Sequence, residues 1–303
     1  MRIVFVGAVR FSRHCLGAVL QSGGNVVGVF QPRPEKATIN ADYADLSTIV
    51  ADTPIPYRQF DNINDLETVE AIRILKPDVI FAFGLSQLIN PVILVIPPKG
   101  VIVTHPALLP CGRGRHPLIW TLIHDHSKGG LTFFHADQGT DTGDILYQVS
   151  FPITDRDDAT SLYRRIETLA EEAMPKVLEL LETDFPPRIR QNDSQAVVWR
   201  KRGEADGEID WKGPARRVFN LVRALTHPYV GAHTYCNGQK VIVWSAFVET
   251  EHTKLEHRPG SIVSVEADSI LVSAGDGLVR LKSWDGLTPL VGDTFNSKPR
   301  SES

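Results

Sequence analysis

The segment V-T-H-P-A-L-L-P-C-G-R-G-R-H-P-L-I-W, residues 103–120, joins the end of an apolar run to a loop rich in proline, glycine and arginine. It places His105 at the end of that run, and the segment G-T-D-T-G-D-I-L, residues 139–146, adds Asp141 and Asp144. A histidine and a carboxylate on neighbouring loops can move a proton between reacting groups. These side chains are therefore the first candidates for a functional site.

The sequence around these segments has the pattern of an α/β fold. We expect strands at residues 1–7, 26–30, 79–83, 100–104 and 130–135, and helices at residues 10–21, 43–51, 63–75 and 118–124. Nearly continuous apolar strands that alternate with helices predict a Rossmann-like parallel sheet covered on both faces. Ligands of such sheets bind beyond the carboxyl ends of the strands. Gly84, His105 and the 136–144 loop should converge at that edge.

The second half of the chain has a different pattern. An amphipathic helix over residues 159–181, with a kink expected at Pro175, is followed by a polar, proline-rich segment. After a helix near residues 214–225, five short strands predict a small antiparallel barrel-like, OB-type domain, at residues 232–236, 240–247, 260–265, 269–273 and 278–282. The expected organisation is a catalytic domain at 1–184, a linker at 185–207, a barrel-like domain at 208–290 and a flexible tail at 291–303.

Composition limits the class of protein. The 303 residues give a formal net charge of −4 and an isoelectric point near 6.2, whereas nucleic-acid binding needs a basic face. Three widely spaced cysteines favour neither a disulfide framework nor a zinc ribbon. No apolar run approaches the roughly 20 residues that span a bilayer, and the N-terminus lacks the pattern of a signal peptide. We expect a cytoplasmic protein without membrane association.

Three other kinds of site have weaker support. The first strand leads into Gly7 without a G-x-G-x-x-G pattern, which disfavours a dinucleotide site, and no phosphate-binding P-loop is present. The His124-Asp125-His126 run suggests a metal site, but histidines two residues apart do not share a helix face. Cys111, beside two arginines, is a candidate nucleophile only if the pKa of its thiol is lowered. We expect no metal.

At these motifs the chain resembles the formyltransferase family that uses N10-formyltetrahydrofolate and includes methionyl-tRNA formyltransferases. The family pattern is N-x-H-P-S-L-L-P, an R-G loop, a tryptophan in the next helix and a later D-x-G-D/A-I. The chain matches it from His105 to Pro110, at Arg113-Gly114, Pro117 and Trp120, and at Asp141-Thr142-Gly143. The segment I-D-W-K-G-P-A-R-R-V-F-N-L-V-R-A-L at residues 209–225 is similar to the entry of the family's C-terminal domain.

Within the family, the R-G-R-H-P loop is most similar to enzymes that formylate amino sugars carried on nucleotides. One of these is the UDP-4-amino-4-deoxy-L-arabinose formyltransferase domain, which acts in lipopolysaccharide biosynthesis. The resemblance implies a nucleotide-linked amino sugar as acceptor and N10-formyltetrahydrofolate as formyl donor. The tRNA branch tends to carry a longer basic loop after the second strand, whereas Arg33 and Lys36 here are offset by Glu35. The small positive charge of this loop therefore disfavours tRNA as the acceptor.

The resemblance also implies roles for individual residues. His105 would stabilise the oxyanion and Asp141 would take up the amine proton. The formyl donor would contact Phe83, Gly84, Leu85, Leu88, Gly139, Thr140 and Asp141. The nucleotide phosphates would meet Arg113, Arg115 and His116, since arginine forks bind phosphate oxygens.

One residue departs from the family pattern. The family asparagine falls at Val103, which faces the same side of its strand as His105. Loss of one oxyanion donor typically costs about 10²–10³ in rate. Three interpretations remain open: an active enzyme with another donor, such as His116 or a water; an enzyme with a different transferred group or acceptor; and a folate- or nucleotide-binding relative with little catalysis.

A homodimer is the oligomeric state that we consider.

Overall fold

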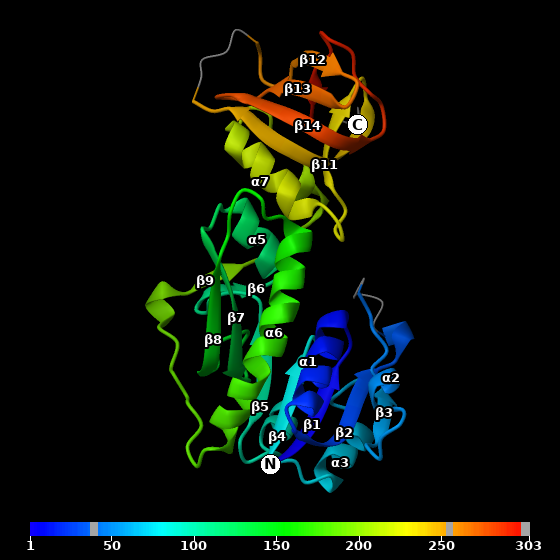
Figure 1. Cartoon of the computed structure of the whole chain (residues 1–303), viewed down its shortest axis with the longest axis vertical. Helices are drawn as coiled ribbons and strands as arrows, with labels where there is room; N and C mark the ends of the chain where they lie inside the picture. The colour runs from blue at the N-terminus through cyan, green and yellow to red at the C-terminus, as the bar shows by residue number, and fades with distance from the viewer. Residues whose placement is uncertain (37–41, 253–256, 298–303) are drawn as a thin grey trace, which may run out of the picture. The chain divides into compact units, whose positions relative to one another are not determined.

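The computed structural model describes residues 1–36, 42–252 and 257–297, and these form two compact units (Figure 1). The first unit comprises Met1–Pro117, Lys128–Phe151 and Arg164–Trp199. The second comprises Leu118–Ser127, Pro152–Tyr163 and the described residues from Arg200 onward. The units thus interleave along the chain, whereas the domains expected from the sequence follow one another.

The first unit is built on a seven-stranded sheet in the order β3-β2-β1-β4-β5-β7-β8. Its five strands from β3 to β5 are mutually parallel, which confirms the predicted fold class. The strands are β1 (Arg2–Gly7), β2 (Asn25–Pro32), β3 (Tyr57–Phe60), β4 (Val79–Phe83), β5 (Val101–His105), β7 (Lys128–His135) and β8 (Ile145–Pro152). Unlike the others, β7 runs antiparallel to β5 and pairs Thr132 with His105.

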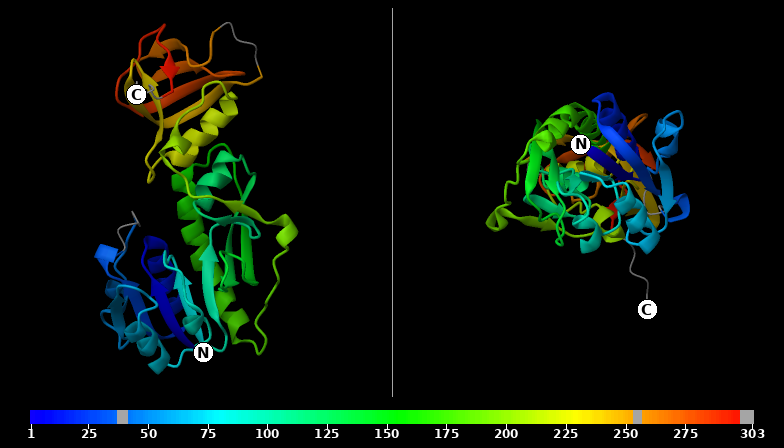
Figure 2. Two further views of the ribbon diagram at one scale, coloured as in Figure 1. Left: turned by 180° about the vertical axis from the view of Figure 1, so that it is seen from behind. Right: turned by 90° about the horizontal axis from the view of Figure 1, so that it is seen from below.

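Helices cover both faces of this sheet, which is why its central strands β1 and β4 are buried along nearly their whole length. Side chains of α3 (Leu66–Ile74) pack with β1, β2 and β4 in one buried cluster. On the other face, α1 (Arg10–Gln21) and α6 (Ala159–Glu182) lie side by side (Figures 1 and 2), joined by an ion pair of 2.7 Å between Arg10 and Glu167. The helix α6 continues through Pro175, so the expected kink does not interrupt it.

Two expected helices of the first unit are shorter in the structure. The helix α2 covers only Ser47–Val50, because the Gln31 side chain binds the backbone of Ala44 and Leu46 and holds the preceding residues extended. The helix α3 begins after Asp65, whose carboxylate accepts a hydrogen bond from the Asn62 amide and closes a turn. Short elements complete the unit: η1 (Pro34–Lys36), α4 (Pro91–Leu94), β6 (Cys111–Gly114), η2 (Asp193–Gln195) and β9 (Val197–Trp199).

The turn after β1 explains why no phosphate group is expected there. The buried Ser12 hydroxyl accepts hydrogen bonds from the amides of Ala8 and Val9 and donates one of 2.6 Å to the Phe83 carbonyl. In dinucleotide-binding folds the corresponding helix N-terminus faces a pyrophosphate. Here the chain satisfies these amides with its own side chain.

The second unit contains a six-stranded antiparallel sheet in the order β12-β13-β14-β11-β10-β15, which confirms the predicted barrel-like domain. The strands are β10 (Ala232–Cys236), β11 (Gln239–Thr250), β12 (Ile262–Glu266), β13 (Ser269–Ser273), β14 (Leu278–Asp285) and β15 (Phe295–Asn296). The helix α7 (Ala215–Leu225) packs on β11, and the unit also holds α5 (Pro117–Ile123) and η3 (Glu204–Gly207). Among the described residues, no helix combines the length and apolar character needed to cross a membrane.

Two segments expected to be irregular carry regular structure. The predicted linker at 185–207 contains β9, which pairs in parallel with β6. The predicted flexible tail at 291–303 contains β15, which pairs with β10 and buries Phe295 against the Trp211 ring at a centroid distance of 5.4 Å. Neither strand was predicted, because a two- or three-residue strand has too little periodicity to be recognised and its partner is distant in sequence. Residues 298–303 of the tail lie outside the described residues.

We predict that Phe295→Ala lowers the free energy of unfolding by about 3–5 kcal/mol, because it removes a buried ring from the core of the second unit. The measurement is urea denaturation followed by tryptophan fluorescence. The control is Phe247 on β11, which is 52% exposed. Phe247→Ala should lower the free energy of unfolding by less than about 1 kcal/mol. Equal effects of the two substitutions would contradict a structural role for β15.

Candidate functional site

His105 ends β5 and is buried, with 6% of its surface exposed. Its Nε2 lies 2.7 Å from the Gly112 carbonyl oxygen, and its Nδ1 lies 3.6 Å from Asp141 Oδ2. Because a carbonyl only accepts hydrogen bonds, Nε2 carries the proton that it donates to Gly112. Nδ1 is therefore the ring nitrogen that faces the carboxylate.

The loop after His105 is fixed from the neighbouring strands. The Thr132 hydroxyl on β7 donates a hydrogen bond of 2.6 Å to the Ala107 carbonyl and accepts one from the Leu109 amide. The Gln148 amide on β8 donates to Thr132 and to the Leu109 carbonyl. The Leu109–Pro110 peptide bond is cis. The hydrogen bonds from Thr132 and Gln148 hold the loop, so the His105 ring lies on a rigid support.

Asp141 comes from the hairpin loop between β7 and β8. Its carboxylate Oδ2 accepts a hydrogen bond of 2.8 Å from the Gly114 amide. Its backbone φ is +56°, in the left-handed region that non-glycine residues rarely adopt. The neighbouring Asp137 shapes the loop by accepting hydrogen bonds from the Gly139 amide and the Thr142 hydroxyl. Gly114 and His105 thus contact the same carboxylate from two different elements.

Asp144, the other acidic candidate, occupies a different place. Its carbonyl accepts the His135 amide at the base of the hairpin, and its side chain lines a polar cavity of about 330 Å³ with His135, Arg188 and Arg190. Burial, together with the Arg188 charge, lowers the pKa of His135, so its ring is neutral at pH 7. Asp141, not Asp144, is the carboxylate beside His105.

The glycines of the arginine loop allow close contact with another strand. Residues 111–114 form β6, which pairs with β9. A Cβ on Gly112 would lie 2.5 Å from the Trp199 ring, and one on Gly114 would lie 2.3 Å from the Trp199 carbonyl oxygen. Both glycines also have positive φ. These glycines allow Trp199 to approach the backbone of the loop.

The three residues expected to bind the nucleotide phosphates lie in different surroundings. Arg113 is buried, and its guanidinium donates to Gln191 Oε1 at 3.0 Å and to Asp193 Oδ1 at 2.9 Å. Both groups that this guanidinium binds belong to the protein. Arg115 is exposed, and its amide donates to the Trp199 carbonyl. His116 is half-buried with a φ of +56°.

The residues expected around the formyl donor also differ from one another. Phe83 is fully buried among Phe5, Phe81 and Phe133, so its ring belongs to the core. Strand register pairs Ala82 with Val103, which places Gly84 beside His105 at the carboxyl ends of β4 and β5.

Gly84 has a φ of +67°, and a Cβ there would lie 2.4 Å from Val9. Leu85 is half-buried against the apolar cluster, whereas Leu88 is 79% exposed with its carbonyl held by Asn64. Gly139 and Thr140 are exposed on the hairpin loop. The backbone at Gly84, the Leu88 side chain and the loop thus remain open to a ligand.

Val103 lies in apolar surroundings. Its half-buried side chain packs against the cluster of Leu109, Phe134 and Ile145 and against the main core of the sheet. A polar amide at this position would lose hydration within that wall. Any oxyanion donor must therefore come from another residue.

The other sequence candidates do not form sites of their own. Within the described ranges, no three His, Cys, Asp or Glu side chains are grouped so that they could hold a metal ion. His124 stacks on Trp120, and Asp125 between the two histidines pairs with Arg216 and Arg223. Burial, together with His126 and Arg217, lowers the pKa of His124.

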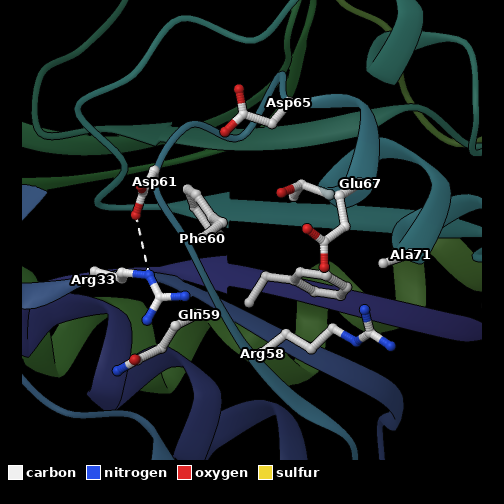
Figure 3. A pocket seen from close by; sticks show the side chains of 10 residues that line it. Arg33, Arg58, Gln59, Phe60, Asp61, Asp65, Glu67 and Ala71 are labelled. Atoms are coloured by element: carbon white, nitrogen blue, oxygen red, sulfur yellow. Dashed lines mark ion pairs between the residues drawn. The ribbon is translucent and has the colours of Figure 1, made fainter.

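A second cavity, of about 320 Å³, lies between β3 and α3 (Figure 3). In the sheet order, β2, β1 and β4 separate it from β5, so it is not part of the His105 site. Arg33 pairs there with Asp61 at 3.1 Å, and Arg58 and Glu67 also line it. The charge of Arg33, one of two basic residues weighed for RNA binding, is thus neutralised by a partner. Residues 37–41, which complete that loop, lie outside the described residues.

Sequence reasoning missed Gln191, Thr132, Gln148 and Trp199. Only the contact of Trp199 could have been inferred from the sequence, because the glycines of the C-G-R-G segment indicate that another group approaches the backbone there. The polar partners lie in segments without a recognisable motif.

The family model of formyl transferases matches residues 1–178, a range that contains His105, Asp141 and the strands of the first sheet. The chain belongs to the formyl transferase family. A second model, of the formyl transferase C-terminal domain, matches residues 202–288. The enzyme class expected from the motifs is thereby confirmed.

Several solved structures share the fold of this chain at low sequence identity. WlaRD, described as a sugar 3N-formyl transferase in the presence of dTDP and 5-N-formyl-THF, has a TM-score of 0.69 and 17% identity over 95% of this chain and 99% of its own. The N-formyltransferase from Helicobacter canadensis, with folinic acid and dTDP-3-aminofucose, has a TM-score of 0.70 and 16% identity over 93% and 99%. HypX from Aquifex aeolicus has a TM-score of 0.62 and 19% identity over 94% of this chain, which spans only 45% of HypX.

We predict that Cys111 takes no covalent part in this formyltransferase. Burial raises the pKa of its thiol, which therefore stays protonated at pH 7 and is a poor nucleophile. Cys111→Ser should keep the rate of formyl transfer, and the thiols of the folded enzyme should react with iodoacetamide more slowly than those of the unfolded chain. Rapid alkylation of Cys111 coupled to loss of activity would contradict this assignment.

Proposed function

We propose that this formyltransferase moves the formyl group of N10-formyltetrahydrofolate to the amine of a nucleotide-linked amino sugar. The observation that supports the chemistry is the buried His105 ring beside Asp141, whose carboxylate is held by the Gly114 amide. The acceptor is supported by the R-G-R-H-P loop and by the similarity along nearly their full length to two structures described with dTDP or a dTDP-sugar.

In the proposed reaction the amine lone pair attacks the formyl carbon, and negative charge develops on the formyl oxygen. The amine loses a proton and the folate N10 gains one as the C–N10 bond breaks. Asp141 is placed to accept the proton from the amine, directly or through water. His105 donates its Nε2 proton to the Gly112 carbonyl, so Nδ1 is the ring nitrogen through which His105 interacts with Asp141. A protonated His105 stabilises the developing negative charge.

The two substrates are assigned to opposite sides of this pair. The pterin of the formyl donor would meet the backbone at Gly84, the side chains of Leu85 and Leu88, and the loop at residues 139–141. The nucleotide phosphates would meet the exposed Arg115, with His116 close in sequence. Arg113 is left out of this assignment because its guanidinium binds Gln191 and Asp193.

We also propose a cytoplasmic location, no membrane association, and a role in lipopolysaccharide biosynthesis. Among the interpretations of Val103, we propose an active enzyme with a different oxyanion donor, His116 being the candidate. A homodimer remains part of the proposal. A methionyl-tRNA acceptor has less electrostatic support, given the net charge of −4.

The test is to incubate the protein with N10-formyltetrahydrofolate and a panel of nucleotide amino sugars, and to follow tetrahydrofolate release by absorbance. We expect turnover with at least one sugar and a loss of about 10²-fold or more in His105→Asn and Asp141→Asn, because the first removes the group that stabilises the negative charge and the second removes the proton acceptor. Folate or nucleotide binding without turnover on any sugar would instead support a non-catalytic relative. Formylation of charged initiator tRNA would favour the tRNA branch.

A companion prediction concerns Val103. We expect Val103→Asn to give no gain in kcat and to lower thermal stability, because it places an amide in an apolar wall. The measurements are kcat on the sugar found above and the melting temperature. Val103→Thr, of similar volume, is the control for packing. A rate gain of about 10²–10³ in Val103→Asn would show that the wild-type enzyme lacks an oxyanion donor.

A further inference from the structure

We infer that Gln191 is a positioning residue that, anchored by Arg113, holds the Asp141 loop in its reactive shape. The inference deepens the proposed function, because it rests on Asp141 as the reacting carboxylate. Gln191 does not contact the carboxylate itself. It acts on the backbone on either side of Thr142 and thereby on the direction in which Asp141 points.

The contacts of Gln191 use both ends of its amide. Its Nε2 donates to the Asp141 carbonyl at 2.9 Å and to the Gly143 carbonyl at 2.7 Å. Its Oε1 accepts a hydrogen bond from Arg113 Nε at 3.0 Å. Gln191 is buried, with 5% of its surface exposed. The loop carbonyls therefore depend on one buried amide group.

The charge of Arg113 fixes the orientation of that amide. A guanidinium has only donors, so the glutamine oxygen must face Arg113 and the nitrogen must face the two loop carbonyls. A second bond from Arg113 to Asp193 holds the guanidinium in place. The arginine thus selects the one amide orientation that binds the loop.

The loop needs such support because of its backbone. Asp141 adopts a left-handed φ of +56°, a conformation that persists where surrounding contacts determine it. On the other side of the loop, Gly143 lies so close to β7 that a Cβ would be 1.7 Å from the His135 carbonyl oxygen. The loop is therefore held between Gln191 and the end of β7.

The segment that carries Gln191 is itself attached at both ends. Ile189 pairs with Ile145 through two backbone hydrogen bonds of 2.8 and 2.9 Å, and β9 pairs with β6. The same β6 supplies the Gly114 amide that binds Asp141 Oδ2. Backbone pairing thus fixes Gln191 and Gly114 relative to each other, and the loop of Asp141 lies between them.

Two substitutions separate this role from simple attachment of the segment. Gln191→Glu keeps an acceptor for Arg113 but has no donor for the loop carbonyls, and Gln191→Met fills the space without polar contacts. We expect both to lower kcat by about 10- to 100-fold, since a small misplacement of a catalytic group has effects of this size. In the unliganded protein, the NMR signal of the Gly114 amide proton should move upfield in both variants, in the direction of Asp141→Ala.

Gln195→Glu is the matched control, because Gln195 is exposed, lies four residues further along the same segment and gains the same charge. It should leave the Gly114 signal and kcat as in the wild type. If Gln191→Met fails to fold, Arg113→Met releases the same amide and should shift the Gly114 signal in the same direction. A wild-type Gly114 signal in folded Gln191 variants overturns the inference. A wild type without formyl transfer would overturn the proposed function alone, since the NMR comparison needs no substrate.

Discussion

The hydrogen bond from the Gly114 amide to Asp141 joins two loops that lie 27 residues apart, and the geometry of the site depends on it. A hydrogen bond to a charged acceptor is worth about 1.5–3 kcal/mol, and the two from Gln191 to the loop carbonyls add about 1 kcal/mol each. The left-handed backbone of Asp141 costs roughly 1–2 kcal/mol. The free energy contributed by these hydrogen bonds exceeds the cost of the left-handed backbone, so Asp141 keeps this conformation without a ligand.

His105 is subject to a comparable constraint. Its Nε2 proton is engaged by Gly112, and its loop is held by Thr132 and Gln148 on the adjacent strands. The ring therefore faces Asp141 with little freedom to rotate. A preorganised pair of this kind spends no free energy on alignment during the reaction, which is the condition under which electrostatic stabilisation is most effective.

The sequence predicts those parts of the fold that depend on local pattern. The limits of α1, β4, β10 and β13 agree with the predicted ones to the residue, because apolar runs are bounded there by glycine, proline or polar turns. The sequence also predicted that His105 and Asp141 converge, but not for the reason that it gave, because β7 is antiparallel to β5 and its carboxyl end at His135 pairs with Ile102 instead of His105. What could not be predicted depends on partners far away in sequence: β9, β15 and the polar contacts of Arg113. A glutamine in a polar segment has no periodicity that would reveal two carbonyl partners 48 and 50 residues earlier.

The pairing of β9 with β6 has a consequence for biosynthesis. During translation, the strands of the first sheet leave the ribosome well before residues 187–199 do. A nascent chain ending near residue 184 therefore contains the sheet, His105 and Asp141. It still lacks Gln191 and Asp193, which bind the Arg113 guanidinium, and Trp199, which packs on Gly112. Chimeras that join the catalytic half of one family member to the C-terminal half of another should accordingly have their junction after Trp199. The segment at residues 187–199 and the loops that it binds then come from the same parent.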